Sequence, residues 1–149
     1  MKDKLLIVVL ILIFAACKDP KKEEKILEKQ VMDLHEKVMA DGETAMQNKM
    51  KMDTLILKKD SIKTVYPSLD TSGENRNMRH LSKQILKADD AMSDWMHNYN
   101  PDFSGKSHQQ ILDYLDQQKK KVSLINRQYD SIIYASNQYL LKFKKKWKK

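Results

Sequence analysis

Methionine and histidine side chains recur in this chain at a spacing that could bind a soft metal ion. Met32, His35 and Met39 lie at i, i+3 and i+7, which places all three on one face of a helix, and Met46 continues the same line. Thioether and imidazole groups are ligands that suit Cu(I) or Ag(I). Packing is the alternative interpretation, because methionine is flexible and fills irregular interfaces between helices.

A second group of the same residue types lies further along the chain. Met92 and Met96 are one helical turn apart, and His97 follows directly. Met92 falls on the apolar seam of its helix, which favours packing. A shared metal site requires the two groups to converge in the folded protein. Its predicted ligands are Met32, His35, Met39, Met92, Met96 and His97.

The C-terminus combines lysines with aromatic side chains. Phe143 and Trp147 are four residues apart and share a helix face, as expected of a helix end that contacts a charged surface. Lipid phosphates, lipopolysaccharide or acidic glycans would be suitable anionic partners. Alternatively, the lysines complement the helix dipole and keep the helix soluble. The lysines concerned are Lys142, Lys144, Lys145, Lys146, Lys148 and Lys149.

The sequence contains none of the common catalytic motifs. It has no glycine-rich phosphate loop, no HExxH and no GxSxG. The lysine-rich segment is not accompanied by a nucleic-acid-binding motif, so we expect no nucleic-acid partner despite the net charge of +8. We therefore predict a protein that is not an enzyme and has no cofactor other than a possible copper ion and a covalent lipid.

The expectation of a lipid comes from the N-terminus. Lysines precede an apolar run from Leu5 to Phe14, which is shorter than the roughly 20 residues needed to cross a bilayer, and Ala15, Ala16 and Cys17 follow. This segment resembles the signal peptide and lipobox of bacterial lipoproteins, with Phe14 where leucine is usual. The resemblance implies that residues 1–16 are removed and that Cys17, the single cysteine, carries the lipid that binds the chain to a membrane.

The residues after Cys17 bear on location. Residues 17–25 are almost entirely charged and are predicted to form a solvated tether. Cys17-Lys18-Asp19 is similar to the export signal of surface lipoproteins from Bacteroidota, although Pro20 stands where a second acidic residue is usual. We expect a location in the bacterial cell envelope, with the outer membrane favoured and surface exposure as an alternative.

Residues 26–149 are predicted to form one helical domain. Three glycines and three prolines exclude a turn-rich β-sandwich. Apolar residues at alternating steps of three and four predict helices over 26–66, from just after a loop of residues 67–74 to about residue 97, and from Ser107 onward, where Gln110 completes a capping box. Short loops between them predict an all-α, up-down-up antiparallel three-helix bundle, with coiled-coil packing and a first and third helix longer than the second.

The seam of the first helix is imperfect. Asp41, Asn48 and Lys59 occupy seam positions, and Gly42 is the expected weak point of that helix. These polar residues could limit pairing with another chain, and the sequence leaves the oligomeric state open. The seam of the second helix has no polar interruption. Its residues are Met78, Leu81, Ile85, Ala88, Met92, Trp95 and Tyr99.

Three segments resemble a known family: Val31-Met-Asp-Leu-His-Glu-Lys-Val-Met39, Ala88-Asp-Asp-Ala-Met-Ser-Asp-Trp-Met-His97 and Tyr114-Leu. They are similar to small helical lipoproteins of Bacteroidota that carry the automatic label of viral A-type inclusion protein, a name that reflects coiled-coil composition. The resemblance implies a helical fold and an envelope location, and no active site. We therefore expect a non-enzymatic membrane-anchored scaffold or a module that binds an envelope protein, with soft-metal binding and anionic-surface binding as alternatives.

Overall fold

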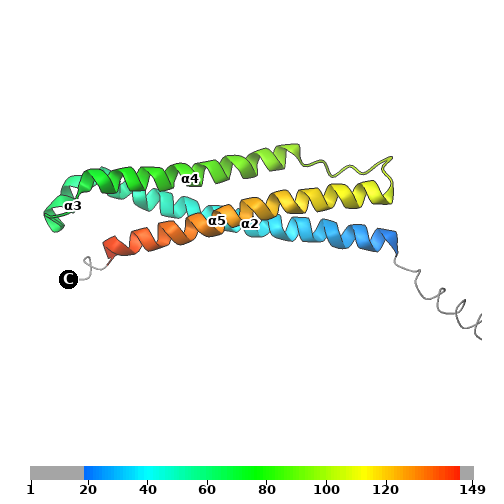
Figure 1. Cartoon of the computed structure of the whole chain (residues 1–149), viewed down its shortest axis with the longest axis horizontal. Coiled ribbons are helices and arrows are strands. Elements are labelled where there is room, and N and C mark those ends of the chain that lie inside the picture. Colours follow the sequence, from blue (N-terminus) through cyan, green and yellow to red (C-terminus); the bar gives the residue numbers. More distant parts are fainter. Residues whose placement is uncertain (1–18, 145–149) are drawn as a thin grey trace, which may run out of the picture.

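The computed structural model describes residues 19–144, and this part of the chain is helical, without a strand (Figure 1). The helices are α2 (Pro20–Leu57), α3 (Lys59–Val65), α4 (Thr71–Asn98) and α5 (His108–Lys144). α2 and α5 run in the same direction, and α4 runs antiparallel to both. The predicted all-α fold is confirmed. The first of the three predicted helices is divided into α2 and α3.

α2 begins at Pro20 rather than at Ile26, so the predicted tether is wrong for residues 20–25. The Asp19 side chain accepts a hydrogen bond of 3.1 Å from the backbone N–H of Lys21 and caps the helix. Pro20 fits the first helical position because it lacks the N–H that would have no partner there. Local capping therefore outweighs the charged composition of this segment.

α2 ends at Leu57, and a turn at Lys58 separates it from α3. No glycine or proline marks this break. The helical seam would bring Lys59 to the core, whereas the interrupted chain leaves Lys59 exposed and buries Ile62, which is 4% exposed. α3 ends at Val65 with Tyr66 as its C-cap, which agrees with the helix end predicted before Pro67.

α2 continues through Gly42, the expected weak point of this helix. The glycine lies beneath Tyr129 of α5, and a Cβ atom at this position would be 3.2 Å from the tyrosine hydroxyl oxygen. The absence of a side chain thus makes room for a large buried ring.

We expect Gly42→Ala to be close to neutral in the wild type, because the gain in helix propensity offsets this close contact. In a Tyr129→Phe background the nearest remaining ring atom is 3.5 Å away, so the same substitution should raise the free energy of unfolding by up to about 1 kcal/mol. Urea denaturation of the four proteins measures both effects. Equal effects in the two backgrounds would contradict the contact.

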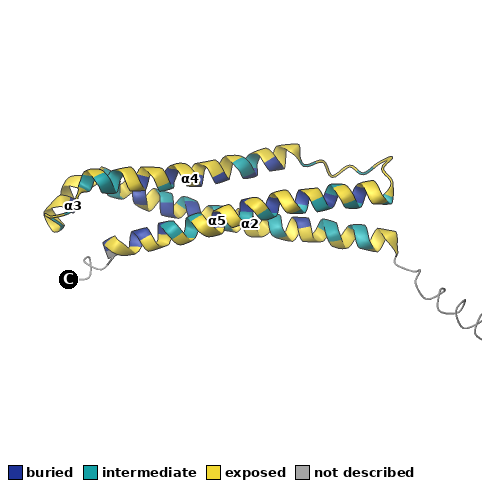
Figure 2. Cartoon of the chain, in the orientation of Figure 1, coloured by how far each residue is buried: buried dark blue, intermediate teal, exposed yellow. Residues whose placement is uncertain are grey.

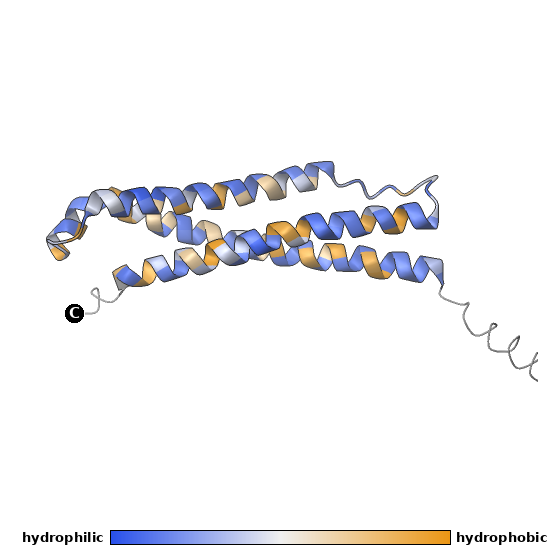
Figure 3. Ribbon diagram, viewed as in Figure 1, coloured by the Kyte–Doolittle hydropathy of each residue, from blue (hydrophilic) through white to orange (hydrophobic). Residues whose placement is uncertain are grey.

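α4 begins at Thr71, a few residues before its predicted start. The carboxylate of Asp70 accepts hydrogen bonds from the N–H groups of Ser72 and Gly73 at 3.1 and 3.0 Å, and the bond from Gly73 is the main reason why the pKa of Asp70 is lowered. The predicted seam of α4 faces the other helices, while its outer surface is hydrophilic (Figures 2 and 3).

α5 begins with the predicted capping box. The N–H of Ser107 donates to Gln110 Oε1 at 2.8 Å, and the N–H of Gln110 faces Ser107 Oγ at 3.4 Å. The loop of residues 99–107 runs beside the first part of α5, so α2 and α5 extend past the end of α4 as predicted (Figure 1). Tyr99 and Phe103 of this loop pack against the core.

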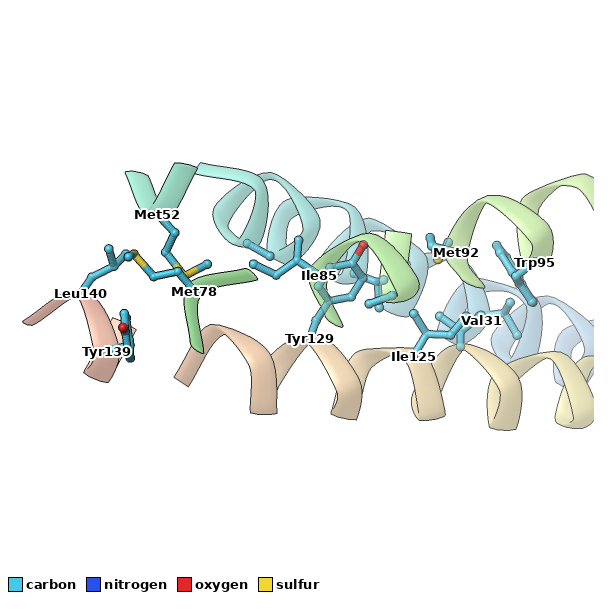
Figure 4. Packing of buried hydrophobic residues seen from close by; sticks show 14 of the residues in the cluster. Val31, Met52, Met78, Ile85, Met92, Trp95, Ile125, Tyr129, Tyr139 and Leu140 are labelled. Atoms are coloured by element: carbon cyan, nitrogen blue, oxygen red, sulfur yellow. The ribbon is translucent and has the colours of Figure 1, made fainter. Parts of the chain in front are cut away.

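The core is one continuous cluster along the rod, to which α2, α4 and α5 all contribute (Figure 4). Side-chain contacts fix the parallel register of α2 and α5. Lys37 Nζ contacts Asp41 of its own helix at 2.5 Å and Asp130 of α5 at 3.1 Å. Hydrogen bonding to Asp41 is the main cause of the raised pKa of Lys37.

A polar contact lies inside this core. Asn48, which is 2% exposed, donates hydrogen bonds to Ser136 Oγ at 3.0 Å and to Asn137 Oδ1 at 2.8 Å. Ser136 in turn donates to the carbonyl oxygen of Ile133 at 3.2 Å. Asn48 therefore helps to fix the register of α2 against α5 within the chain. A buried amide of this kind selects one register at some cost in stability.

Replacing Asn48 by alanine is expected to lower the free energy of unfolding by about 1–2 kcal/mol, since it removes two hydrogen bonds and leaves a small cavity. The double variant Asn48→Leu/Ser136→Ala should regain much of this loss, because it buries apolar groups on both helices. Chemical denaturation gives both values. A double variant less stable than Asn48→Ala would contradict the expectation that apolar burial replaces the stability lost with the hydrogen bonds.

Candidate functional site

The most distinctive surface feature is a groove between α2 and α4, with a volume of ≈ 690 Å³. Four methionines line it, and we call this surface the methionine groove. Met39 and Met46 come from α2, and Met92 and Met96 come from α4. Because residues seven apart on one helix and four apart on the other share a face, each helix presents its two thioethers to the same groove.

These methionines differ in burial. Met92 is 3% exposed and belongs to the core, whereas Met39 and Met96 are 46% and 41% exposed. Met46 is half-buried and packs against the core. The groove thus combines a buried thioether with exposed ones that solvent and solutes can reach.

Acidic groups and one phenol complete the lining. Glu43 and Asp89 both border the groove, and Tyr129 of α5 contributes to it. Burial is the main reason why the pKa of Tyr129 is raised to about 12, and the negative charge of Asp89 adds to the shift. The carboxylates make the groove locally acidic in a basic protein, which favours a cation.

The raised pKa of Tyr129 predicts a loss of stability at high pH. The neutral phenol is the form that the folded state favours, so its contribution is complete below pH 10 and declines as the pH rises toward 12. The shift corresponds to about 2–3 kcal/mol. Urea denaturation at pH 8 and pH 11.5 should show a smaller pH-dependent loss for Tyr129→Phe than for the wild type. Equal losses would contradict the assignment.

The structure brings together only part of the predicted metal-binding set. Met39, Met92 and Met96 line the methionine groove, whereas Met32, His35 and His97 do not. The six predicted ligands therefore do not all line one groove, and their convergence in a single site stays a prediction. Met46, which the sequence shows as a continuation of the Met39 line, takes part instead.

His35 and His97 make local contacts. The ring centroid of His35 lies 5.5 Å from that of Trp95, and its buried Nδ1 has no hydrogen-bond partner among the described residues. The ring nitrogen Nδ1 of His97 is 2.9 Å from the carbonyl oxygen of Ser93, to which it can donate. Met32 is 36% exposed on α2. None of these three side chains is part of the groove lining.

Trp95 anchors an aromatic cluster where α4 ends. Its indole N–H donates to Gln118 Oε1 at 3.0 Å, and its ring centroid is 5.0 Å from that of Tyr99. Tyr114 continues the cluster, 6.1 Å from Tyr99. Trp95 was predictable as a seam residue, whereas its buried polar partner was not predicted. The signal was present, because the three-four spacing between Leu115 and Val122 places Gln118 on the seam of α5.

The lysine-rich C-terminus is only partly described. Lys142 is exposed, and its Nζ lies 4.6 Å from the centroid of the Tyr139 ring, a cation–π distance. Tyr139 donates to the backbone oxygen of Glu74 at 3.0 Å and also to its carboxylate, which joins the end of α5 to the start of α4. Other predicted site residues lie outside the described part of the chain: Cys17, Lys145, Lys146, Lys148 and Lys149.

Two general properties concern the described residues as a whole. Within residues 19–144, no group of three or more His, Cys, Asp or Glu side chains is arranged to hold a metal ion. In the same range, no helix has both the length and the apolarity needed to cross a membrane.

Comparison of the chain with protein-family models, curated proteins and solved structures finds no match.

Proposed function

We propose that this protein is a lipid-anchored lipoprotein of the bacterial cell envelope whose helical rod is a non-enzymatic scaffold or protein-binding module. The observation that carries the proposal is the position at which the rod begins. α2 starts at Pro20, three residues after Cys17, the cysteine of the lipobox-like segment. Such a short connection, at most about 11 Å long, would hold one end of the rod at the membrane.

The geometry of the rod supports a spacing role. α2 contains 38 residues, which corresponds to about 57 Å. The far end of the rod contains α3, the start of α4 and the end of α5 (Figure 1). Tyr66 and Phe143 stack edge to face there, with ring centroids 6.4 Å apart. An anchor at Cys17 would thus present a closed, ordered end tens of ångströms from the bilayer.

The buried polar groups also support a structural role. Asn48 bonds to Ser136, Trp95 bonds to Gln118, and Tyr139 bonds to Glu74. Each of these contacts joins two helices. These hydrogen bonds therefore fix how the helices pack against one another, as expected of a scaffold.

The anchor is tested by expressing the full chain in a bacterium with an intact lipoprotein pathway. We expect the wild type to partition into the membrane fraction and the detergent phase, with a mature N-terminus at an acylated Cys17 by mass spectrometry. Cys17→Ser should abolish acylation and shift the protein out of the detergent phase. A wild-type protein that retains Met1 or lacks the lipid would refute the proposal.

The spacing role is tested with fluorophores at two exposed positions. In the acylated protein, Lys25→Cys labels the near end and Ser61→Cys labels the far end, roughly 50 Å apart along the helices. In proteoliposomes that contain a quencher attached to lipid headgroups, we expect strong quenching at position 25 and little at position 61. Equal quenching would mean that the rod lies along the membrane, which contradicts a spacer.

A further inference from the structure

We propose that the methionine groove binds a soft monovalent metal ion, Cu(I) or Ag(I), through the thioether sulfurs of Met39, Met46, Met92 and Met96. This inference goes beyond the scaffold role and does not depend on the lipid anchor. It uses α2 and α4 together, so the site exists only in the folded bundle.

The contrast with other methionines argues that these residues do more than pack. Met52 and Met78 are 0% and 1% exposed and fill the core where α2, α4 and α5 meet (Figure 4). A methionine used only for packing is expected to be buried in this way. Met39 and Met96 leave almost half of their surface in water. Met50 is also exposed, at 65%, so exposure alone assigns no role. Met39 and Met96 differ from Met50 because they line one groove together with Met46 and Met92.

The arrangement suits the coordination chemistry of soft ions. A thioether is uncharged and polarizable, so it prefers Cu(I) or Ag(I) over harder cations such as Mg²⁺ or Ca²⁺. Facing helices pack about 8–10 Å apart, and unbranched methionine side chains on both of them can reach an ion between the two backbones. Because thioethers carry no proton, such binding would not require the release of one, unlike binding by cysteine or histidine.

The charges around the groove support the same ligand class. Neutral thioethers cannot balance the charge of a cation, but Glu43 and Asp89 border the groove. The influence of Asp89 extends to the Tyr129 hydroxyl, whose pKa it helps to raise. Another groove, between α4 and α5, has a volume of ≈ 390 Å³ and is bordered by Lys87 and Arg127. Its lining contains no methionine, so it offers neither the soft ligands nor the acidic surroundings.

The experiment uses the full chain with Cys17→Ser, so that the thiol cannot bind the metal. Ag(I) is titrated by calorimetry, and Cu(I) by competition with a chromogenic chelator under anaerobic conditions. We expect one ion per chain. The variant with leucine at all four groove positions should bind at least about tenfold more weakly, while Met50→Leu, a 65% exposed methionine of α2 outside the groove, should bind like the parent protein.

Leucine is close to methionine in volume, so the fourfold variant should remain folded, which thermal unfolding verifies. If it does not fold, methyl NMR of the parent protein decides instead. The methyl signals of the four groove methionines should shift on addition of Ag(I), and those of Met52 and Met78 should not. Unchanged binding by a folded fourfold variant, shifts confined to other methionines, or loss of binding in His35→Ala/His97→Ala would each overturn the proposal.

Discussion

Replacing Tyr129 by alanine is expected to lower the free energy of unfolding by about 3–5 kcal/mol. Tyr129 is 1% exposed and is the largest of the fully buried side chains. It reaches from α5 toward α2, where its hydroxyl oxygen lies above Gly42, and it contributes to the methionine groove. Its removal would leave a cavity at the centre of the rod that neighbouring side chains cannot fill. Since small domains are stable by about 5–15 kcal/mol, this loss is a large fraction of the total.

Urea denaturation followed by circular dichroism measures the effect, and Tyr129→Phe is the matched control. The hydroxyl makes no hydrogen bond within the described part of the chain, so phenylalanine should cost less than about 1 kcal/mol. A Tyr129→Ala variant within about 1 kcal/mol of the wild type would show that the ring is not enclosed by the three helices.

The apolar seams were predictable because helical periodicity depends on local spacing. The seam of α4 packs against the other helices as expected, and the capping box at Ser107 and Gln110 forms as its sequence pattern predicts. The same local rules predicted the helix end near Tyr66. In each case, neighbouring residues within one or two turns determine the structure.

Other features depend on which helices meet and in what register, which periodicity does not contain. Asn48 and Ser136 are 88 residues apart in the sequence, yet they form a buried hydrogen bond. Gly42 was expected to weaken its helix, but Tyr129 from a distant segment occupies the space above it. The break at Lys58 likewise depends on how Ile62 reaches the core, and not on a local helix-breaking residue.

The candidate metal site depends both on local spacing and on the register between helices. Periodicity correctly placed Met39 and Met46 on one face of α2. It could not decide whether that face lies opposite Met92 or opposite Trp95 along the neighbouring helix. In the folded chain, Met46 lines the groove and His35 lies beside Trp95 in the aromatic cluster. A ligand set inferred from one helix at a time therefore needed the register of α2 against α4.

The second large effect is expected for Trp95→Ala, at about 4–5 kcal/mol of unfolding free energy. Trp95 is 6% exposed, and its indole packs beside His35 and Tyr99. Truncation would open a cavity where α4 meets the following loop. It would also leave the side-chain amide of Gln118, which is 5% exposed, without the indole N–H as its partner. Chemical denaturation of the variant gives the loss.

A double-mutant cycle separates the cavity from the hydrogen bond. Trp95→Phe keeps an aromatic ring but removes the N–H donor, so it should cost about 1–3 kcal/mol through the unpaired amide of Gln118. Gln118→Leu alone leaves the indole N–H unpaired and should cost a similar amount. In the double variant neither polar group remains, so its loss should be clearly smaller than the sum of the two single losses. Additive losses would mean that the bond between Trp95 and Gln118 does not join α4 to α5, and the anchoring role of Trp95 would then have to come from ring packing alone.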